Sequence, residues 1–302
     1  MIKVGVLGGT GYVGEELIRL LYNHKEVEIV KIMSTSKYGE NFSDTYRNFA
    51  GYSKLICEEL NFDTVCDNID VLFSCLPYGV LMEHLTCEML DKVKVIDLGV
   101  DYRFMTEEEY KQYYNKEHKS IELAKYFEYG LSEWNRENIK KAKHIANPGC
   151  FATAIEFALM PVIKEGIIEN NVIVDGKCSL SGSGRTLTVG THFIEANESV
   201  KPYKIIGHPH TIEAEKAINY VAGTNVLLNF VPHIVPMQRG ILVTCYTTLK
   251  ESMEHEDIDA IYNKYYGKEK FVEILKRGMY IETKWVKNSN IKQQLFQRYI
   301  VC

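Results

Sequence analysis

The stretch Met1–Gly14, "MIKVGVLGGTGYVG", decides the fold class of this 302-residue chain. Residues 2–7 form an apolar run typical of a buried strand, and residues 12–24 repeat apolar side chains at helical spacing. The glycines between them follow the pattern G-x-x-G-x-x-G. Glycines so spaced permit a tight turn, let the backbone approach a pyrophosphate and bring the helix against the strand. The stretch therefore predicts a dinucleotide-binding turn, and a glycine-rich turn without a ligand is the alternative. The expected cofactor contacts are Gly8, Thr10, Gly11, Tyr12, Val13 and Gly14.

Outward from this stretch, strand-like and helix-like segments alternate. The runs "VEIVKIMS" (27–34), "DVLFSCLP" (70–77) and "VKVIDLG" (93–99) are strand candidates, and polar, helix-like segments separate them. Such alternation is typical of a parallel sheet covered by helices. The class is therefore α/β, with a Rossmann-type dinucleotide-binding domain over residues 1–147.

The pattern changes after this point. A helix is expected over residues 151–160, and long β-rich runs follow at 224–237 and 239–250. Closely spaced strands favour an antiparallel sheet. We therefore expect a second α+β domain over residues 148–302, with a mainly antiparallel sheet. The family resemblance given below implies that this domain carries catalysis and self-association.

Composition excludes several classes of function. The net charge is -5, so no basic stripe is available to follow a phosphate backbone, and nucleic-acid binding is not expected. No window approaches the roughly 20 apolar residues of a membrane helix, and the N-terminus does not resemble a signal peptide. We expect a cytoplasmic protein that acts on a small molecule and does not bind membranes.

The second strand candidate indicates which dinucleotide is bound. Folds that prefer NAD usually place an Asp or Glu after this strand to accept the ribose 2′-hydroxyl. Here Ser34-Thr35-Ser36-Lys37 offers hydroxyls and a cation and no acid. This chemistry suits a 2′-phosphate, so NADP is predicted, with Ser34 and Ser36 as contacts. Lys37 could instead be a solvated loop lysine.

Cys150 differs from the other cysteines. The eight cysteines form no CxxC pair, and most lie within apolar runs, where a cysteine acts as a small buried apolar residue. Cys150 follows Pro148-Gly149 and immediately precedes the helix expected at 151–160. A helix N-terminus favours the thiolate, and the turn leaves the side chain accessible. The position predicts a nucleophile, with a structural cysteine as the alternative.

A nucleophilic thiol needs an acid/base partner. The segment "GHPHTIEAE" contains His208, His210 and Glu213, and alternation around Pro209 would point both rings the same way. A loop with two exposed histidines is one alternative. A zinc site is another, but no further ligand stands out, so no metal is expected. Thiolate, histidine and nicotinamide together indicate the reversible conversion of an acyl phosphate to a semialdehyde through a thioester and a thiohemiacetal.

Seven motifs resemble the N-acetyl-γ-glutamyl-phosphate reductase family, which is NADP-dependent, acts in arginine biosynthesis and belongs to the semialdehyde dehydrogenases. They run in order along the chain: "GGTGYVGEELIRLL", "VIDLGVDYRF", "YGLSEWNRENIKKAKHIANPGCFAT", "SLSGSGR", "GHPHTIEAE", "PHIVPMQRGI" and "ETKWVKNSN". The resemblance implies reduction of N-acetyl-L-glutamyl 5-phosphate to N-acetyl-L-glutamate 5-semialdehyde and phosphate, by a homo-oligomer (a dimer or a tetramer).

The resemblance also implies roles for single residues. Cys150 becomes the acyl acceptor and His210 the first candidate for the acid/base, with His208 and Glu213 in the same pocket; the choice between the two histidines stays open. Further implied cofactor contacts are Leu76, Pro77, Ser181 and Gly182. Arg103 and Arg185 become candidates for the substrate's carboxylate or phosphate, because guanidinium binds both in bidentate fashion. Each arginine could equally be a structural ion-pair residue.

The chain departs from the family pattern in two ways. Phe151, Ala152, Pro209 and Ile212 replace family residues around the two motifs of the site. The last twelve residues, "IKQQLFQRYIVC", match nothing in the family's ending, which returns to the first domain. We therefore expect a truncated or altered C-terminus and weaker cofactor binding than in a version with the family ending. Two alternatives follow: an enzyme like aspartate-semialdehyde dehydrogenase, or a truncated, inactive dinucleotide-binding protein.

Overall fold

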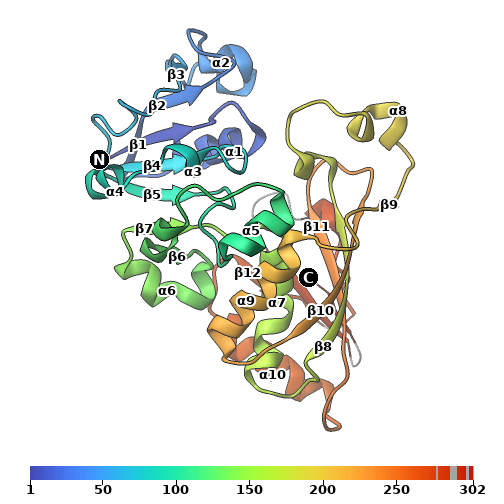
Figure 1. The fold of residues 1–302 in the computed structure, drawn as a ribbon. Coiled ribbons are helices and arrows are strands. Elements are labelled where there is room, and N and C mark those ends of the chain that lie inside the picture. Colours follow the sequence, from blue (N-terminus) through green and yellow to red (C-terminus); the bar gives the residue numbers. More distant parts are fainter. Residues whose placement is uncertain (277, 286–290, 297–298, 302) are drawn as a thin grey trace. The chain divides into compact units, whose positions relative to one another are not determined.

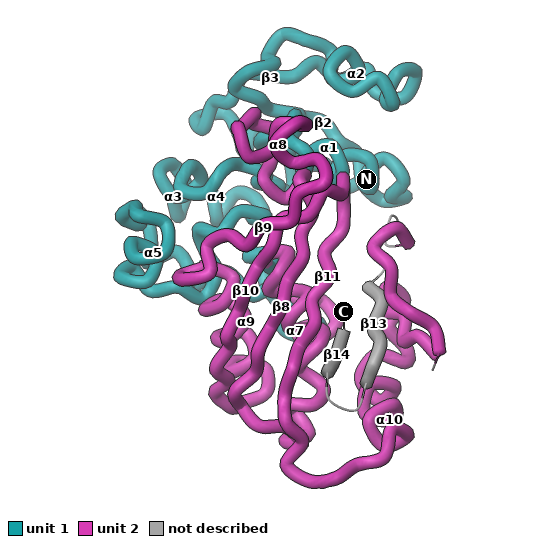
Figure 2. Tube along the Cα trace, turned by 90° about the vertical axis from the view of Figure 1, so that its right-hand side faces the viewer, with its two compact units in different colours: residues 1–130, 136–148 teal, residues 131–135, 149–302 magenta. Residues whose placement is uncertain are grey.

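The computed structural model describes residues 1–276, 278–285, 291–296 and 299–301. Residues 286–290, which end the last family-like motif, lie outside this range. The chain divides into two compact units (Figure 2). Unit 1 comprises residues 1–130 and 136–148, and unit 2 comprises residues 131–135 and 149–302.

Unit 1 is built on a parallel sheet with the strand order β3-β2-β1-β4-β5-β7-β6 (Figure 1). Every pairing in it is parallel along the described chain. The strands predicted at 2–7 and 27–34 coincide with β1 and β2. The strand bounds are β1 Ile2–Leu7, β2 Val27–Ser34, β3 Glu58–Glu59, β4 Val71–Ser74, β5 Lys94–Asp97, β6 Phe127–Tyr129 and β7 His144–Ala146.

Helices and short turns connect the strands of unit 1. The side chains of Val4 and Val6 on β1, Ile18 on the first helix and Ile32 on β2 form one buried apolar cluster with Phe42. Burial on both sides explains the continuous apolar runs seen in the sequence. The helical elements are α1 Tyr12–Leu21, α2 Phe42–Thr45, η1 Arg47–Phe49, α3 Leu81–His84, α4 Cys87–Lys92, α5 Glu107–Tyr114 and η2 Ile121–Tyr126; α6 Ser132–Lys141 spans the boundary between the units.

Unit 2 contains a mixed sheet with the order β12-β13-β14-β11-β8-β10-β9. Four of the six pairings between its described strands are antiparallel, which fits the predicted, mainly antiparallel sheet. The long β8–β10 ladder is parallel, because a helix forms the crossover between these strands. The strand bounds are β8 Asn171–Cys178, β9 Lys201–Pro202, β10 Leu227–Ile234, β11 Ile241–Tyr246, β12 Val272–Ile274, β13 Ile291–Phe296 and β14 Tyr299–Val301.

Helices cover one face of this sheet (Figure 1). On β8, Val172, Val174 and Cys178 are buried, whereas Ile173 between them is 53% exposed. Such alternation indicates a sheet with one face packed against helices and the other uncovered. The helical elements of unit 2 are α7 Cys150–Lys164, η3 Leu180–Ser183, η4 Val189–Thr191, α8 Phe193–Ala196, α9 Pro209–Ala222, α10 His255–Tyr266 and η5 Thr283–Trp285. Among the described residues, no helix has the length and apolar character needed to cross a membrane.

Candidate active site

The glycine loop of unit 1 is sterically restricted to glycine at three points. Gly8 has a φ of +68°, and a Cβ there would lie 2.7 Å from the Cys75 carbonyl oxygen. A Cβ on Gly9 would lie 2.5 Å from Ile32, and one on Gly14 would lie 2.6 Å from the Gly8 carbonyl oxygen. Because these three positions are glycines and carry no Cβ, α1 can start close to the end of β1. The loop therefore has the close packing that a dinucleotide-binding turn requires.

The loop after β2 lies beside the glycine loop. The hydroxyls of Thr10 and Ser34, both buried, are 2.8 Å apart. Ser34 Oγ also accepts the backbone N–H groups of Ser36 (3.4 Å) and Lys37 (3.2 Å). Lys37 Nζ lies 3.1 Å from the Glu40 carboxylate on the surface. Ser34 thus shapes the loop, while Ser36 is exposed and Lys37 forms one surface ion pair.

The strand order of the sheet indicates where a cofactor would bind. β1 pairs with β2 on one side and with β4 on the other, so the strand order reverses at β1. In sheets of this kind, ligands bind outside the carboxyl ends of the strands at such a reversal. The glycine loop follows β1, and Leu76 and Pro77 follow β4 at the same edge. Tyr12 and Val13, at the start of α1, are 40% and 54% exposed.

Asp101, in the segment after β5, fixes the loop after β4. Its carboxylate accepts the backbone N–H groups of Gly79 (2.7 Å) and Met82 (3.2 Å) and the Tyr110 hydroxyl (2.7 Å). The Asp101 carbonyl lies 2.6 Å from His118 Nε2. His118 Nδ1 accepts the Ser120 N–H, so Nε2 carries the proton and donates to the Asp101 carbonyl. Sequence reasoning missed this residue, although it lies within the "VIDLGVDYRF" motif.

The buried carboxyl of Asp97 predicts a pH dependence. Burial, followed by the nearby Asp101 charge, raises the pKa of Asp97 to about 6, although the Gly99 N–H and Arg103 act in the opposite direction. The native state therefore binds more protons than the unfolded state between about pH 4 and pH 6. This contribution to stability is present below about pH 4 and is lost as the pH rises through 6. As the pH rises from 5 to 8, ionisation of Asp97 should therefore lower the free energy of unfolding by about 1–2 kcal/mol.

Asp97→Asn should remove this dependence. From pH 5 to pH 8, the unfolding free energy of the variant minus that of the parent chain is expected to increase by about 1–2 kcal/mol. Chemical denaturation at the two pH values measures it. A difference independent of pH would show that Asp97 ionises normally.

Arg103 is 4% exposed, and its described hydrogen bonds go to the main chain. Nε donates to the Asn147 carbonyl (2.7 Å), and Nη2 donates to the Leu98 carbonyl (3.2 Å). Both acceptors belong to unit 1. These bonds show that the guanidinium of Arg103 donates to main-chain carbonyls. The substrate contact suggested for Arg103 stays a prediction.

In unit 2, Cys150 occupies the first position of α7, with Gly149 as the N-cap, and its side chain is exposed. A thiol at this position lies at the positive end of the helix dipole, which favours the thiolate. By contrast, burial raises the pKa of the thiols of Cys57, Cys66 and Cys178, and that of Cys75 to about 12. Cys87 is also exposed at a helix start, but that helix has only six residues.

His208 is a buried N-cap residue. It is 6% exposed, and its Nδ1 accepts the backbone N–H of His210 at 3.2 Å, at the start of α9. Burial, with smaller contributions from the charges of His210 and Lys204, lowers the pKa of His208 to about 3. The ring is therefore neutral at physiological pH, with its proton on Nε2. The family resemblance implied a place for His208 in the pocket, but nothing in the sequence indicated this capping role.

His210 and Glu213 lie within the first two turns of the helix that His208 caps. The His208 and His210 ring centroids are 5.0 Å apart, and His210 is only partly buried. Glu213 is 1% exposed, and its Oε1 accepts the Gly149 N–H at 2.6 Å. Glu213 thus connects α9 to the residue that precedes Cys150. The structure brings together in unit 2 the thiol, the two histidines and the acid that the sequence singled out.

Aromatic packing explains this convergence. Phe151, which follows Cys150, contacts the rings of His208 (centroids 5.9 Å apart), His210 (6.4 Å) and Phe230 (4.9 Å). The Tyr203 ring packs on His208, and its hydroxyl lies 3.6 Å from Cys178 Sγ. Sequence reasoning noted Phe151 only as a departure from the family motif and missed Tyr203, which lies in an irregular segment without a pattern.

Three other predicted residues lie after β8 in unit 2. Ser181 and Gly182 are part of η3, where the Ser181 hydroxyl lies 3.1 Å from that of Ser179. Arg185 is exposed. The cofactor role of Ser181 and Gly182 and the substrate role of Arg185 stay predictions. Among the described residues, no group of three or more His, Cys, Asp or Glu side chains could hold a metal ion.

Two protein-family models match the chain. Residues 3–142 match "Semialdehyde dehydrogenase, NAD binding domain", and residues 150–298 match "Semialdehyde dehydrogenase, dimerisation domain". Together the two matches cover most of the chain.

Two curated relatives are N-acetyl-gamma-glutamyl-phosphate reductases. The N-acetyl-gamma-glutamyl-phosphate reductase of Lachnoclostridium phytofermentans is 44% identical over 291 residues, which are 96% of this chain and 84% of the relative. The reductase of the same name from Clostridium botulinum (strain Eklund 17B) is 45% identical over 292 residues, with the same coverage.

Solved structures show the same fold at low identity. Aspartate semialdehyde dehydrogenase II from Vibrio cholerae superposes with a TM-score of 0.74 at 14% identity, over 100% of this chain and 93% of that one. The Candida albicans aspartate semialdehyde dehydrogenase, solved with NADP, gives a TM-score of 0.68 at 16% identity, over 100% and 92%.

Proposed function

The chain belongs to the semialdehyde dehydrogenase family, among the N-acetyl-gamma-glutamyl-phosphate reductases, and on this premise we propose that it reduces N-acetyl-L-glutamyl 5-phosphate to N-acetyl-L-glutamate 5-semialdehyde and phosphate. The observation that carries the proposal is the exposed Cys150 at the start of α7, whose neighbour Phe151 packs on the rings of His208 and His210 at the start of α9. A thiol at a helix start with an imidazole nearby is suited to accept an acyl group.

Cys150 is the proposed nucleophile. Its thiol gives a proton to the His210 imidazole, and the thiolate attacks the acyl carbon. The carbon–oxygen bond to phosphate then breaks, His210 returns the proton to the leaving phosphate, and a thioester remains on Cys150. A reduced nicotinamide, when bound, would supply the hydride that converts the thioester to the oxyanion of a thiohemiacetal. Collapse of this oxyanion breaks the carbon–sulfur bond and releases the aldehyde. The thiolate that remains takes one proton from solvent through His210, which restores the thiol.

His210 is the proposed acid/base, and His208 is a positioning residue. His208 Nδ1 is engaged by the His210 N–H, and the lowered pKa prevents His208 from accepting a proton at neutral pH. Glu213 holds the Gly149 N–H and so sets the start of the helix that carries the thiol. The substrate's carboxylate or phosphate is assigned to Arg185, which is exposed on the segment after β8.

NADP is the proposed cofactor. The glycine loop, the reversal of strand order at β1 and the match to an NAD-binding domain support a nicotinamide dinucleotide. The loop after β2 offers the exposed Ser36 and the cation of Lys37, both suited to a 2′-phosphate. Leu76 and Pro77 at the sheet edge, and Ser181 and Gly182 after β8, complete the proposed contacts.

Self-association is the proposed state of assembly. Residues 150–298 match a dimerisation domain. Between β8 and α9 several large apolar side chains are more than half exposed, which is typical of an interaction surface. They are Leu187, Val189, Phe193, Ile194, Val200, Ile205 and Ile206. We propose a homodimer or homotetramer, and a cytoplasmic location, as the sequence predicts.

An assay of the reverse reaction tests the function. The purified chain, N-acetyl-L-glutamate 5-semialdehyde and phosphate should reduce NADP⁺, and NADP⁺ should be used at least about tenfold better than NAD⁺, since a charge-assisted contact contributes about 1.5–3 kcal/mol. Aspartate semialdehyde is the matched control substrate.

Two other outcomes of this assay would favour the alternative functions. Turnover of aspartate semialdehyde alone would favour the sibling enzyme. Binding of NADPH without turnover of either substrate would favour a dinucleotide-binding protein without catalysis.

A further inference from the structure

Unit 1 contains a cavity of about 420 Å³ at the amino ends of three neighbouring strands. β5, β7 and β6 run parallel, and the cavity is lined by α4, which precedes β5, and by the residues where β6 and β7 begin. The glycine loop and Leu76-Pro77 follow the carboxyl ends of strands in the same sheet. The cavity therefore lies at the edge opposite the proposed cofactor contacts of unit 1. Its polar and aromatic lining residues are Cys87, Asp91, Lys125, Tyr126, Lys143 and His144.

The imidazole of His144 directs an unused hydrogen-bond donor into this cavity. The residue is 4% exposed, and its Nδ1 accepts the backbone N–H of Val95 at 3.2 Å. The ring proton is therefore on Nε2. Nε2 has no acceptor among the described residues and is not fully enclosed by protein, so its N–H faces the cavity that His144 lines. A donor in so buried a ring costs free energy until an acceptor reaches it.

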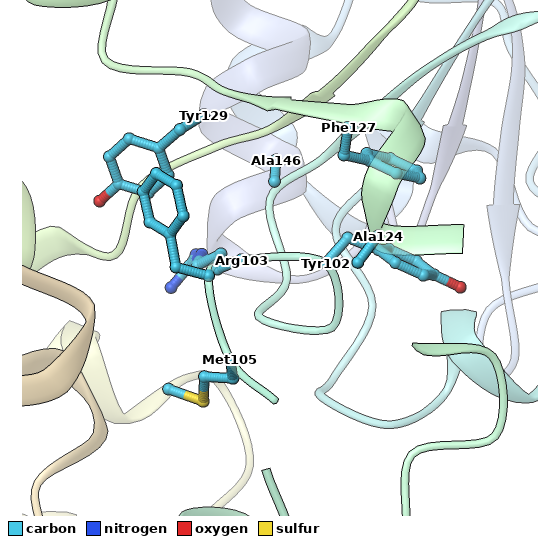
Figure 3. Close-up of a pocket in the computed structure, with 8 residues that line it drawn as sticks. Tyr102, Arg103, Met105, Ala124, Phe127, Tyr129 and Ala146 are labelled. Atoms are coloured by element: carbon cyan, nitrogen blue, oxygen red, sulfur yellow. The ribbon is translucent and has the colours of Figure 1, made fainter. Parts of the chain in front are cut away.

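Packing fixes the orientation of this ring. Phe127 contacts His144 with the ring centroids 5.5 Å apart. Phe127 in turn stacks on Tyr102, with the centroids 4.4 Å apart and the planes at 5°, beside a smaller cavity of about 100 Å³ (Figure 3). Burial, followed by the charge of Lys143, lowers the pKa of His144, although Asp91 acts in the opposite direction. The ring is therefore neutral at physiological pH and offers one N–H.

The charges around the cavity do not cancel. Lys125 and Lys143 contribute two ammonium groups, and neither forms an ion pair with a described side chain. Lys125 Nζ instead lies 5.0 Å from the centre of the Tyr126 ring. Asp91 contributes one carboxylate, which also lacks an ion-pair partner in the described part of the chain. The cavity thus presents two positive charges, one negative charge and one N–H donor.

We propose that this cavity binds an acidic amino acid. The two carboxylates of the ligand are held by the ammonium groups of Lys125 and Lys143, and one of them also accepts the His144 Nε2–H. The ammonium group of the ligand is held by the Asp91 carboxylate. Two negative charges and one positive charge on the ligand complement the charges of the cavity. A volume of about 420 Å³ is within the range of small-molecule sites, roughly 300–1,000 Å³.

Cys87, which has no assigned role in binding, reports on occupancy because its exposed thiol lines the cavity. Iodoacetamide alkylation of the Cys87 peptide, quantified by mass spectrometry, is measured on the purified chain with L-glutamate. The matched controls are glutarate, which lacks the ammonium group, and L-glutamine, which lacks the second carboxylate. Saturating L-glutamate should lower the alkylation rate of Cys87 about tenfold, because the rate follows the unoccupied fraction. Each control compound should bind about fivefold or more weakly, because one charge of the cavity stays unpaired.

Three variants assign the contacts, with Kd measured by calorimetric titration. Lys143→Gln is expected to raise the Kd for L-glutamate about five- to tenfold, the effect of losing a charge-assisted contact at a partly exposed site. Asp91→Asn should raise it by a similar factor and remove the preference for L-glutamate over glutarate. The matched control is Lys141→Gln, which makes the same charge change at an exposed lysine outside the cavity lining. It should leave the Kd within about twofold.

Equal protection of Cys87 by L-glutamate and glutarate would overturn the proposal, and so would an unchanged Kd in both Lys143→Gln and Asp91→Asn. Slower alkylation of Cys150 in place of Cys87 would also overturn it, since the amino acid would then bind in unit 2. None of these measurements uses turnover. A parent chain without reductase activity would therefore reject the proposed function and leave this proposal standing.

Discussion

Replacement of Cys150 by serine is expected to lower kcat on the order of 10⁴-fold, the scale at which loss of a nucleophile acts. The serine hydroxyl keeps the position and nearly the size of the thiol. The serine hydroxyl proton, however, is far harder to remove than the thiol proton. The helix dipole is too weak to make up this difference in acidity. Binding of NADPH should be unchanged, because Cys150 is not among the residues proposed to contact the cofactor. Steady-state kinetics and fluorescence titration with NADPH measure the two effects.

The matched control is Cys87→Ser. Cys87 is also exposed and also begins a helix, but it belongs to α4 of unit 1, whereas Cys150 and the two histidines belong to unit 2. Its replacement should leave kcat within about twofold. Full activity of Cys150→Ser, or loss of activity in Cys87→Ser alone, would contradict the assignment of the nucleophile.

Replacement of His210 by asparagine is expected to lower kcat by about 10²–10⁴-fold, the usual contribution of a general acid/base. The same change at His208 should have a far smaller effect, within about tenfold. Asparagine is a good N-cap, so its side-chain oxygen can accept the backbone N–H that His208 Nδ1 accepts now. Because His208 does not take up a proton near neutral pH, its replacement removes no proton carrier.

The pH profile separates the two histidines. In the parent chain and in His208→Asn, kcat/KM should depend on an ionising group of the free enzyme near neutral pH, and His210→Asn should lose that dependence. Circular dichroism checks that each variant is folded. A greater loss of kcat in His208→Asn than in His210→Asn would reverse the assignment.

Much of the fold follows from local patterns. The strands at 2–7 and 27–34 and the helix that begins at Tyr12 were predictable because apolar periodicity and glycine spacing are local properties of the chain. Cys150 could be singled out for a similar reason, since a Pro-Gly turn before a helix is visible in a few residues. The parallel pairing of β8 with β10 was not predictable, because adjacent β-rich runs do not reveal that α9 crosses between these two strands.

The sequence by itself was sufficient to predict the α/β class, the dinucleotide-binding loop, the thiol of Cys150 as nucleophile, and His208, His210 and Glu213 as its neighbours. Only the tertiary structure decided how these groups are used. His208 became a buried cap with a depressed pKa because Phe151, Tyr203 and Phe230 enclose its ring. Arg103 became a ligand of main-chain carbonyls because β5 and β7 are neighbours in the sheet. The burial and the pKa of a side chain depend on residues that are distant along the chain. No local sequence pattern indicates which of these residues will be in contact.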